Sequence, residues 1–201
     1  MQPVKSRREM YSEATRAALL DEATTMFAAR GYAGTSLEDV ASASQVTRGA
    51  VYHHFASKQA LFEAVLEAQE ERVMAVVAAA AEGGRDPWEA AMLALDAYLA
   101  ECCDEAYGRL AWQEGPAALG WHRWRECEEK YAFGLVERFV HTLIEAGYLE
   151  DRAVDSLVRF SFWMLGGAGL ALAEAVEADR PRLREEWGYL IRRSISGMRI
   201  N

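Results

Sequence analysis

The chain has 201 residues, of which 51% are hydrophobic, enough to bury a substantial core in one or two domains. Its net charge of −9 is not that of a protein that binds nucleic acid over its whole surface. The charge is uneven, however. Seven Lys/Arg accompany six Asp/Glu up to Lys58, whereas 15 accompany 25 beyond it. Only the first part of the chain is therefore expected to meet a polyanion.

Three features bear on the cellular compartment. The 3 cysteines include the adjacent pair Cys102 and Cys103, which is a poor disulfide framework and favours a reducing cytoplasm. No apolar segment follows the basic N-terminus, so no signal peptide is expected. The longest uncharged run is 160–173, which is shorter than the ~20 residues that span a bilayer. We expect a cytoplasmic protein without a membrane partner.

Helical periodicity runs through nearly the whole chain, and no segment alternates strictly enough to predict a strand. A first helix is predicted from Ser12, as its N-cap, to a stop at Gly31. A capping box of Thr35 and Glu38 opens a short second helix. A third short helix spans about 47–54, and Ser57 caps a longer helix.

The rest of the chain is also predicted to be helical. The long helix ends at Gly83-Gly84, and further helices are predicted at about 88–103, 106–113, 121–146, 152–178 and 182–199. The fold class is therefore all-α. We expect a three-helix helix-turn-helix domain over 1–60 and a helical ligand-binding and dimerisation domain over 61–201.

The two short helices are joined by only three residues, 44–46, and follow a longer packing helix. This arrangement is typical of a helix-turn-helix, whose second helix lies in the major groove of DNA. Val51 and Phe55 are four residues apart and would hold that helix to the core. Tyr52 and His53 would then point outward, where they can donate to phosphate oxygens.

The neighbouring residues fit the same interpretation. Thr47 can cap the helix, Arg48 can bind a guanine edge or a phosphate, and Gly49 with Ala50 forms a thin leading edge. Lys58 lies in the first turn of the next helix, where an anion would be held by free N–H groups and the ammonium together. The alternative is a helical bundle without a DNA role, which leaves the exposed Tyr-His pair unexplained. His54 suits a boundary position equally well.

The stretch from Gly31 to Leu66 reads GYAGTSLEDVASASQVTRGAVYHHFASKQALFEAVL. It resembles the N-terminal domain of the TetR/AcrR family of transcriptional regulators. The resemblance implies phosphate contacts from Thr35, Thr47, Tyr52, His53 and Lys58, and base contacts from Arg48, Gly49 and Ala50. It also implies a second domain that combines a ligand pocket with a dimer interface.

The last two predicted helices are the candidates for the dimer interface. The final helix carries a continuous apolar stripe, and the helix before it is apolar nearly all round. A four-helix interface about a two-fold axis would suit a palindromic operator. Alternatively, the stripe packs within the monomer. The predicted interface residues are Phe160, Trp163, Gly167, Leu170, Leu183, Trp187, Leu190, Ile191 and Ile195.

The aromatic-rich middle of the chain is the candidate pocket, because ligand pockets favour aromatic walls with few polar groups. Alternatively, each tryptophan packs in the core or an interface. The predicted lining residues are Tyr98, Cys102, Trp112, Gln113, Trp121, Trp124 and Trp163.

The sequence thus predicts a ligand-responsive repressor, not an enzyme, with double-stranded operator DNA, a small apolar or aromatic effector and a second copy of itself as partners. The alternative is an orphan, thiol-sensing or protein-sensing regulator of the same type. The Cys/His spacing is irregular, so no metal or other cofactor is expected. No ordered set of nucleophile and base, and no phosphate loop, supports catalysis.

Overall fold

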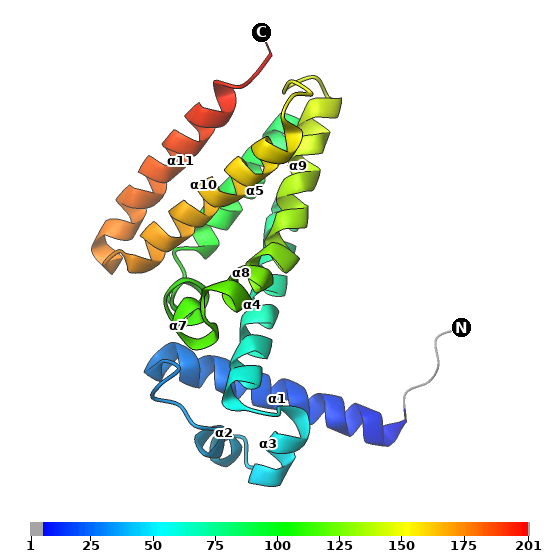
Figure 1. The fold of residues 1–201 in the computed structure, drawn as a ribbon, viewed down its shortest axis with the longest axis vertical. Coiled ribbons are helices and arrows are strands. Elements are labelled where there is room, and N and C mark those ends of the chain that lie inside the picture. The colour runs from blue at the N-terminus through cyan, green and yellow to red at the C-terminus, as the bar shows by residue number, and fades with distance from the viewer. Residues whose placement is uncertain (1–5, 201) are drawn as a thin grey trace. The chain divides into compact units, whose positions relative to one another are not determined.

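The structure is a computed structural model that describes residues 6–200. In this range the chain is helical apart from turns, loops and one isolated antiparallel bridge between Leu149 and Arg199. It divides into two compact units, Met1–Leu66 and Glu67–Asn201. Helix α4 (Lys58–Ala81) begins in the first unit and continues into the second (Figure 1). The all-α fold class is confirmed, and a functional boundary at residue 60 stays a prediction.

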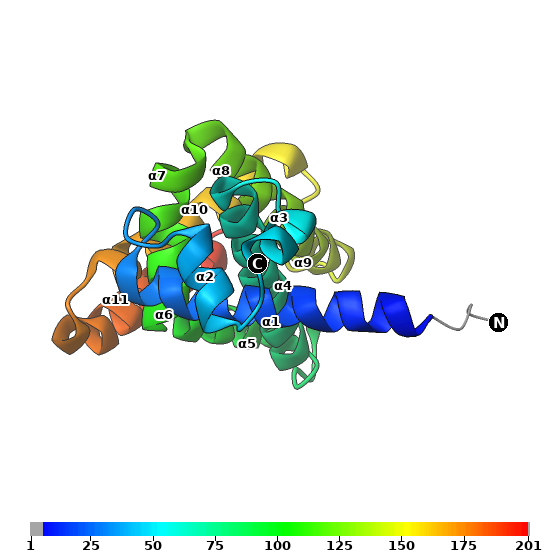
Figure 2. The same cartoon turned by 90° about the horizontal axis from the view of Figure 1, so that it is seen from below.

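The first unit is built from α1 (Arg7–Arg30), α2 (Leu37–Ala43), α3 (Arg48–His54) and the first turns of α4. Helix α2 packs against both α1 and α3 (Figure 2). Apolar residues from all four helices make its core. Burying apolar surface of this kind stabilises a fold by about 25 cal/mol per Å². Side chains of the core that are fully buried include Leu19, Phe27, Val40, Val51 and Phe62.

Two helix starts differ from the sequence prediction. Helix α1 begins at a capping box of Ser6 and Glu9, so Ser12 lies inside the helix. Helix α2 is capped by Ser36 and Asp39, one residue later than the predicted pair. The end of α1 agrees better with the sequence prediction than its start does. Gly31 follows α1 with a φ of 73°, a conformation that glycine adopts without strain.

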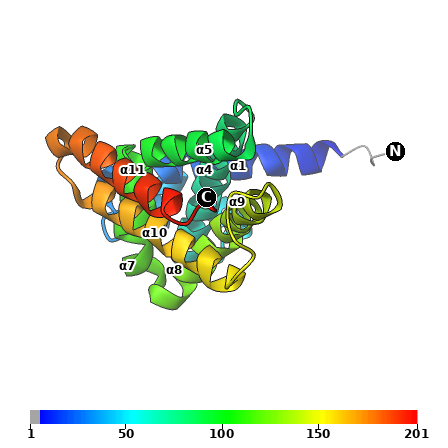
Figure 3. The same cartoon turned by 90° about the horizontal axis from the view of Figure 1, so that it is seen from above.

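The second unit contains the rest of α4 and a succession of shorter helices, two of them π-helical. Helices α10 and α11 lie side by side, and α5 packs along α11 (Figure 3). The elements are α5 (Pro87–Glu101), α6 (Glu105–Tyr107), π-helical η1 (Gly108–Glu114), α7 (Gly115–Leu119), α8 (Trp121–Glu128), π-helical η2 (Glu129–Phe133), α9 (Gly134–Glu145), α10 (Val154–Glu174), 3₁₀-helical η3 (Glu177–Asp179) and α11 (Arg180–Ser196).

Helix α10 packs against η1, α9 and α11. At Gly169 an added Cβ would lie 2.6 Å from the Trp112 ring, so only glycine lets that indole approach the helix. By length and composition alone, α10 is long and apolar enough to cross a membrane, with a mean hydropathy of 1.3 over 18 residues. Core helices of soluble proteins can have the same length and composition.

Candidate DNA-binding face and effector pocket

Helix α3 has two distinct faces. Val51 is fully buried, and Phe55 just after the helix is 4% exposed, so these two residues anchor α3 as predicted. Thr47 is the N-cap, and its hydroxyl accepts from the Ala50 N–H at 3.2 Å. The other predicted DNA-facing residues of this segment, Arg48, Gly49, Tyr52 and His53, are exposed, and Ala50 is half-buried.

Arg48 is held in place from two sides. Its Nε lies 2.9 Å from Glu38 Oε1 on α2, and its Nη2 donates to the Tyr52 hydroxyl at 3.3 Å. The Tyr52 ring also lies beneath the guanidinium, 5.3 Å from its centroid. All three side chains are solvent-exposed, so the ion pair adds little stability. Its effect is to orient the guanidinium on the outer side of α3.

Lys58 links the start of α4 to the turn after α1. Its Nζ donates to the Tyr32 carbonyl at 2.9 Å and lies 4.2 Å from the Tyr32 ring centroid. The Ser57 hydroxyl caps α4 by accepting from the Ala60 N–H, as predicted. An ammonium has three donors, and the carbonyl occupies one of them. The half-buried lysine is therefore fixed at the start of α4, and its ammonium can still donate hydrogen bonds to an anion.

Thr35 requires a correction. Its side chain is only 2% exposed, and its hydroxyl donates to the Met26 and Gly31 carbonyls at the end of α1. With the α2 capping box at Ser36, Thr35 turns inward, and its hydroxyl ties the start of α2 to the last turns of α1. The expectation that this side chain contacts phosphate is therefore wrong for this structure.

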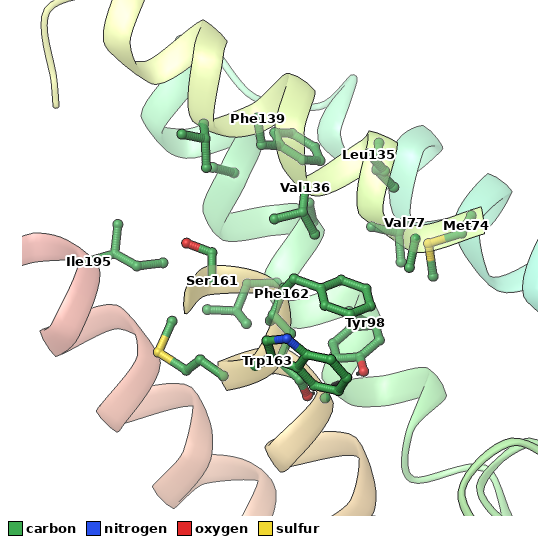
Figure 4. A pocket seen from close by; sticks show the side chains of 18 of the residues that line it. Met74, Val77, Tyr98, Leu135, Val136, Phe139, Ser161, Phe162, Trp163 and Ile195 are labelled. Carbon is green, nitrogen blue, oxygen red and sulfur yellow. Dashed lines mark hydrogen bonds between the residues drawn. The ribbon is translucent and has the colours of Figure 1, made fainter. Parts of the chain in front are cut away.

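The second unit encloses an apolar cavity of about 120 Å³. Side chains of α4, α5, α9, α10 and α11 converge on it (Figure 4). Four predicted pocket residues line it, namely Tyr98, Trp112, Trp124 and Trp163. The Tyr98 hydroxyl donates to the Leu165 carbonyl at 3.3 Å, which fixes one wall.

Three predicted pocket residues lie elsewhere. Cys102 is buried beside Tyr98 but does not line the cavity. Gln113 is exposed, and its amide donates to the Ala173 carbonyl of α10. Trp121 is 54% exposed and stacks on Trp163 with ring centroids 6.2 Å apart. Aromatic density alone could not tell these surface and packing positions from lining positions.

Two buried carboxyl groups also line the cavity. Glu70 on α4 is fully buried and Glu128 at the end of α8 is 4% exposed. The Tyr107 hydroxyl donates to Glu70 Oε1 at 2.9 Å, and the two carboxyl groups share a hydrogen bond. The remaining oxygens, Oε2 of Glu70 and Oε1 of Glu128, have no hydrogen-bond partner within the described residues.

Burial dominates the chemistry of this pair. Loss of solvation raises the pKa of Glu70 to about 7, against the lowering effects of Tyr107, Glu128 and Arg72. Burial, followed by the neighbouring charge of Glu70, raises the pKa of Glu128 well above its usual range. At neutral pH the pair therefore retains a proton.

The sequence carried a signal for these two acids that our prediction missed. Glu70 continues the buried series of Leu66, Val73 and Val77, so it occupies a core position of α4. Glu128 likewise follows the buried Trp124 by four residues. An acid on the apolar side of a helix is rare unless it is paired or functional.

An apolar surface remains uncovered on α10 and α11. On α10, Phe160, Trp163 and Leu170 are 48%, 40% and 42% exposed, and Gly167 lies among them at helical spacing. On α11, Leu190 is 54% exposed, while Leu183, Trp187 and Ile195 are half-buried. Ile191 is 1% exposed, so it belongs to the core of the monomer and not to an interface.

The chain matches two family descriptions. Residues 19–65 match "Bacterial regulatory proteins, tetR family", and residues 88–198 match "Tetracyclin repressor-like, C-terminal domain". It is 26% identical over 152 residues to the transposon Tn10 TetC protein of Escherichia coli, covering 76% of each chain. It is 45% identical over 67 residues to the transcriptional repressor Rv3405c of Mycobacterium tuberculosis, covering 32% of this chain and 36% of that one.

The fold matches solved structures of the same kind. A TetR-family transcriptional regulator from Pectobacterium atrosepticum superposes with a TM-score of 0.83, at 26% identity over 98% of this chain and 99% of the other. The N-terminal match covers the helix-turn-helix of the first unit, and the C-terminal match covers most of the second. The chain therefore belongs to the TetR family of transcriptional regulators.

Proposed function

We propose that this protein is a ligand-responsive repressor that binds a palindromic operator as a homodimer in the cytoplasm and is released from it by a small molecule. The observation that carries the proposal is the exposed face of α3. Arg48, Tyr52 and His53 are solvent-exposed there, while Val51 on the opposite side holds the helix to the core. Thr47, Gly49, Ala50 and Lys58 complete this face. In a helix-turn-helix this is the side that meets the major groove.

Phosphate and base contacts are divided along this surface. Lys58, Tyr52 and His53 supply donors to the DNA backbone, which sets position, and Arg48 supplies a fork that can read a guanine edge. His54 is half-buried, and burial lowers its pKa, with the nearby His53 and Arg16 adding to the effect. We assign His54 to the boundary of the domain rather than to DNA.

Effector binding would act through the second unit. Trp163 both lines the cavity and belongs to the exposed apolar surface of α10, so a ligand in the cavity contacts a residue of the proposed dimer interface. A ligand that prefers one arrangement of the two protomers shifts the population toward it. The operator affinity falls when that arrangement no longer fits successive major grooves.

A thiol-sensing regulator is the less favoured alternative. Cys102 and Cys127 are buried, and burial raises the pKa of both Cys102 and Cys103. A reactive cysteine needs an accessible thiolate, which a raised pKa opposes. Cys103 is the most accessible of the three, and burial raises its pKa although Arg184 and Arg180 act in the opposite direction.

Replacing Lys58 tests the docking of α3 and α4. Lys58→Ala should weaken binding to all duplexes by roughly tenfold and lower the slope of log K against log salt by about 0.9, the effect of one phosphate contact. Fluorescence anisotropy over a salt series, on an operator selected from random duplexes, measures both. Lys58→Arg should retain the slope. Unchanged affinity and slope in a folded Lys58→Ala protein would refute the proposed contact.

Replacing Glu38 tests whether it orients Arg48. Glu38→Gln removes the carboxylate that holds the guanidinium at 2.9 Å. We expect tighter binding to non-specific DNA, by a few-fold, because a negative charge near the phosphates is lost. We also expect weaker discrimination at the base pair that Arg48 reads. Glu22→Gln on α1, outside the proposed surface, is the control, and equal selectivity of Glu38→Gln and the unaltered protein would contradict this role.

A further inference from the structure

The cavity of the second unit has mostly apolar walls and two acidic residues that no basic lining residue neutralises. Glu70 and Glu128 lie there, each with one carboxyl oxygen lacking a hydrogen-bond partner. No Lys, Arg or His is found among the residues that line the cavity. The cation that acts on Glu70 is Arg72 of α4, which is 44% exposed and donates to Glu101 at 2.8 Å. The retained proton and the Tyr107 hydrogen bond offset part of the cost of burying the two acids, but the two unpartnered oxygens still lack a donor.

We propose that the effector is a compact hydrophobic organic cation, a ring bearing a protonated amine, whose ammonium group binds between Glu70 and Glu128. The inference rests on the proposed function, because it names the chemistry of the ligand that the same cavity takes. It refines the apolar or aromatic effector expected from the sequence by adding a positive charge.

The surroundings of the two acids favour an ammonium over other groups. The phenol of Tyr107 and the rings of Tyr98 and Trp112 line the same cavity. Aromatic faces attract a desolvated cation, and carboxylates accept its hydrogen bonds. An anionic ligand would face repulsion from the pair, and a neutral hydrocarbon would leave both free oxygens without a partner.

The size of the cavity limits the ligand. A volume of about 120 Å³ compares with the ~150 Å³ apolar cavity that holds benzene in an engineered protein. One ring therefore fits without large movement of the walls. The π-helical turns η1 and η2, which follow Tyr107 and Glu128, are irregularities of a kind often found at functional sites.

Proton release provides a signature of the site. At neutral pH the pair holds a proton that a bound ammonium would displace, because a cation favours the ionised form of both carboxyls. The proton leaves to solvent as the ammonium forms hydrogen bonds to the two groups. Calorimetry in buffers of different ionisation enthalpy should then show a buffer-dependent heat for a cationic ligand, and none for a neutral one.

The test uses three probes of one shape on the full-length protein. Benzylamine is cationic, benzyl alcohol neutral and benzoate anionic at pH 7. We expect benzylamine to bind at least tenfold tighter than benzyl alcohol, and benzoate not to bind. Glu70→Gln and Glu128→Gln should each reduce benzylamine affinity at least tenfold while leaving that of benzyl alcohol within about twofold. Glu71→Gln, at an exposed neighbouring position, is the matched control.

The outcomes separate this inference from the proposed function. Equal or tighter binding of benzyl alcohol or benzoate, or no binding of benzylamine, would overturn the cationic effector, as would benzylamine affinity that survives both Gln variants. The repressor proposal would then be judged by whether neutral aromatic compounds release the operator. If benzylamine binds as expected but neither it nor larger amines change operator affinity, the cation site stands and the ligand-responsive function fails.

Discussion

A protein carrying Leu170→Glu and Leu190→Glu should sediment as a monomer of 22.4 kDa and lose at least about 100-fold in operator affinity. Both leucines lie on the exposed apolar surface, one on α10 and one on α11. A two-fold interface places each such surface against its own copy, so two substitutions bring four carboxylates into the contact. Like charges without partners in an apolar interface cost several kcal/mol.

The loss of affinity follows from the geometry of the DNA. In the proposed dimer each protomer carries one α3, and the two would read half-sites about 34 Å apart. Linking two weak contacts raises the overall affinity by ~10² to 10⁴ through effective concentration. A monomer forfeits that factor while keeping its own contacts, so it should still bind a single half-site weakly and with the same base preference.

The fold of the monomer should survive these changes, because the two leucines are 42% and 54% exposed in the single chain. Val76→Glu on α4, another exposed apolar position at 40%, is the control and should remain dimeric with full affinity. Sedimentation velocity and anisotropy report mass and affinity on the same samples. A double variant that stays dimeric, or that binds the full operator normally as a monomer, would refute the proposed interface.

The exposure pattern of the proposed DNA-binding face of α3 could be predicted from the sequence because its signals are local. Val51 and Phe55 lie four residues apart, which fixes the inward side of α3 and leaves Tyr52 and His53 outside. The capping box was placed one residue early, at Thr35, because two adjacent pairs have the same pattern, whereas the phosphate contact of Thr35 was implied by the family resemblance. Only the tertiary bonds of Thr35 to Met26 and Gly31 decide between them.

The pocket was less predictable because its residues come from helices far apart in the chain. Tyr98, Trp112, Trp124 and Trp163 were identified by residue type, yet Trp121 has the same type and lies on the surface. The acids Glu70 and Glu128 resemble surface glutamates unless the helix phase is read with care. Their proximity depends on how α4 and α8 pack, which periodicity does not specify.

Removing one acid of the buried pair should stabilise the protein at alkaline pH. Glu70 keeps its proton to about pH 7 when folded and releases it near 4.5 when unfolded. The unfolded state therefore binds fewer protons between these values, and the free energy of unfolding falls as pH rises through this window, by roughly 3 kcal/mol in all. Glu70→Gln abolishes this loss and should gain a comparable amount at pH 8, with little change at pH 4.5.

The glutamine amide of Glu70→Gln can replace the hydrogen bonds of the Glu70 carboxyl group. Its oxygen can still accept from the Tyr107 hydroxyl, and its NH₂ can donate to Glu128. The other titratable groups that act on Glu70 are Arg72 of the same helix and Glu128 from α8, with Tyr107 donating its hydrogen bond from α6. The substitution keeps these side chains in place but removes the charge that raises the pKa of Glu128. A gain at pH 8 would therefore report the cost of burying two acids together without a cation.

Urea unfolding at pH 4.5, 6 and 8 measures the expected divergence between the two proteins. Glu71→Gln, on the exposed side of α4, should follow the unaltered protein at every pH because water already solvates that charge. A Glu70→Gln protein that is equally or less stable at pH 8 would mean that the carboxylate is compensated within the chain. Addition of benzylamine at pH 8 should stabilise the unaltered protein more than Glu70→Gln, because the ligand then supplies the positive charge that the buried pair lacks.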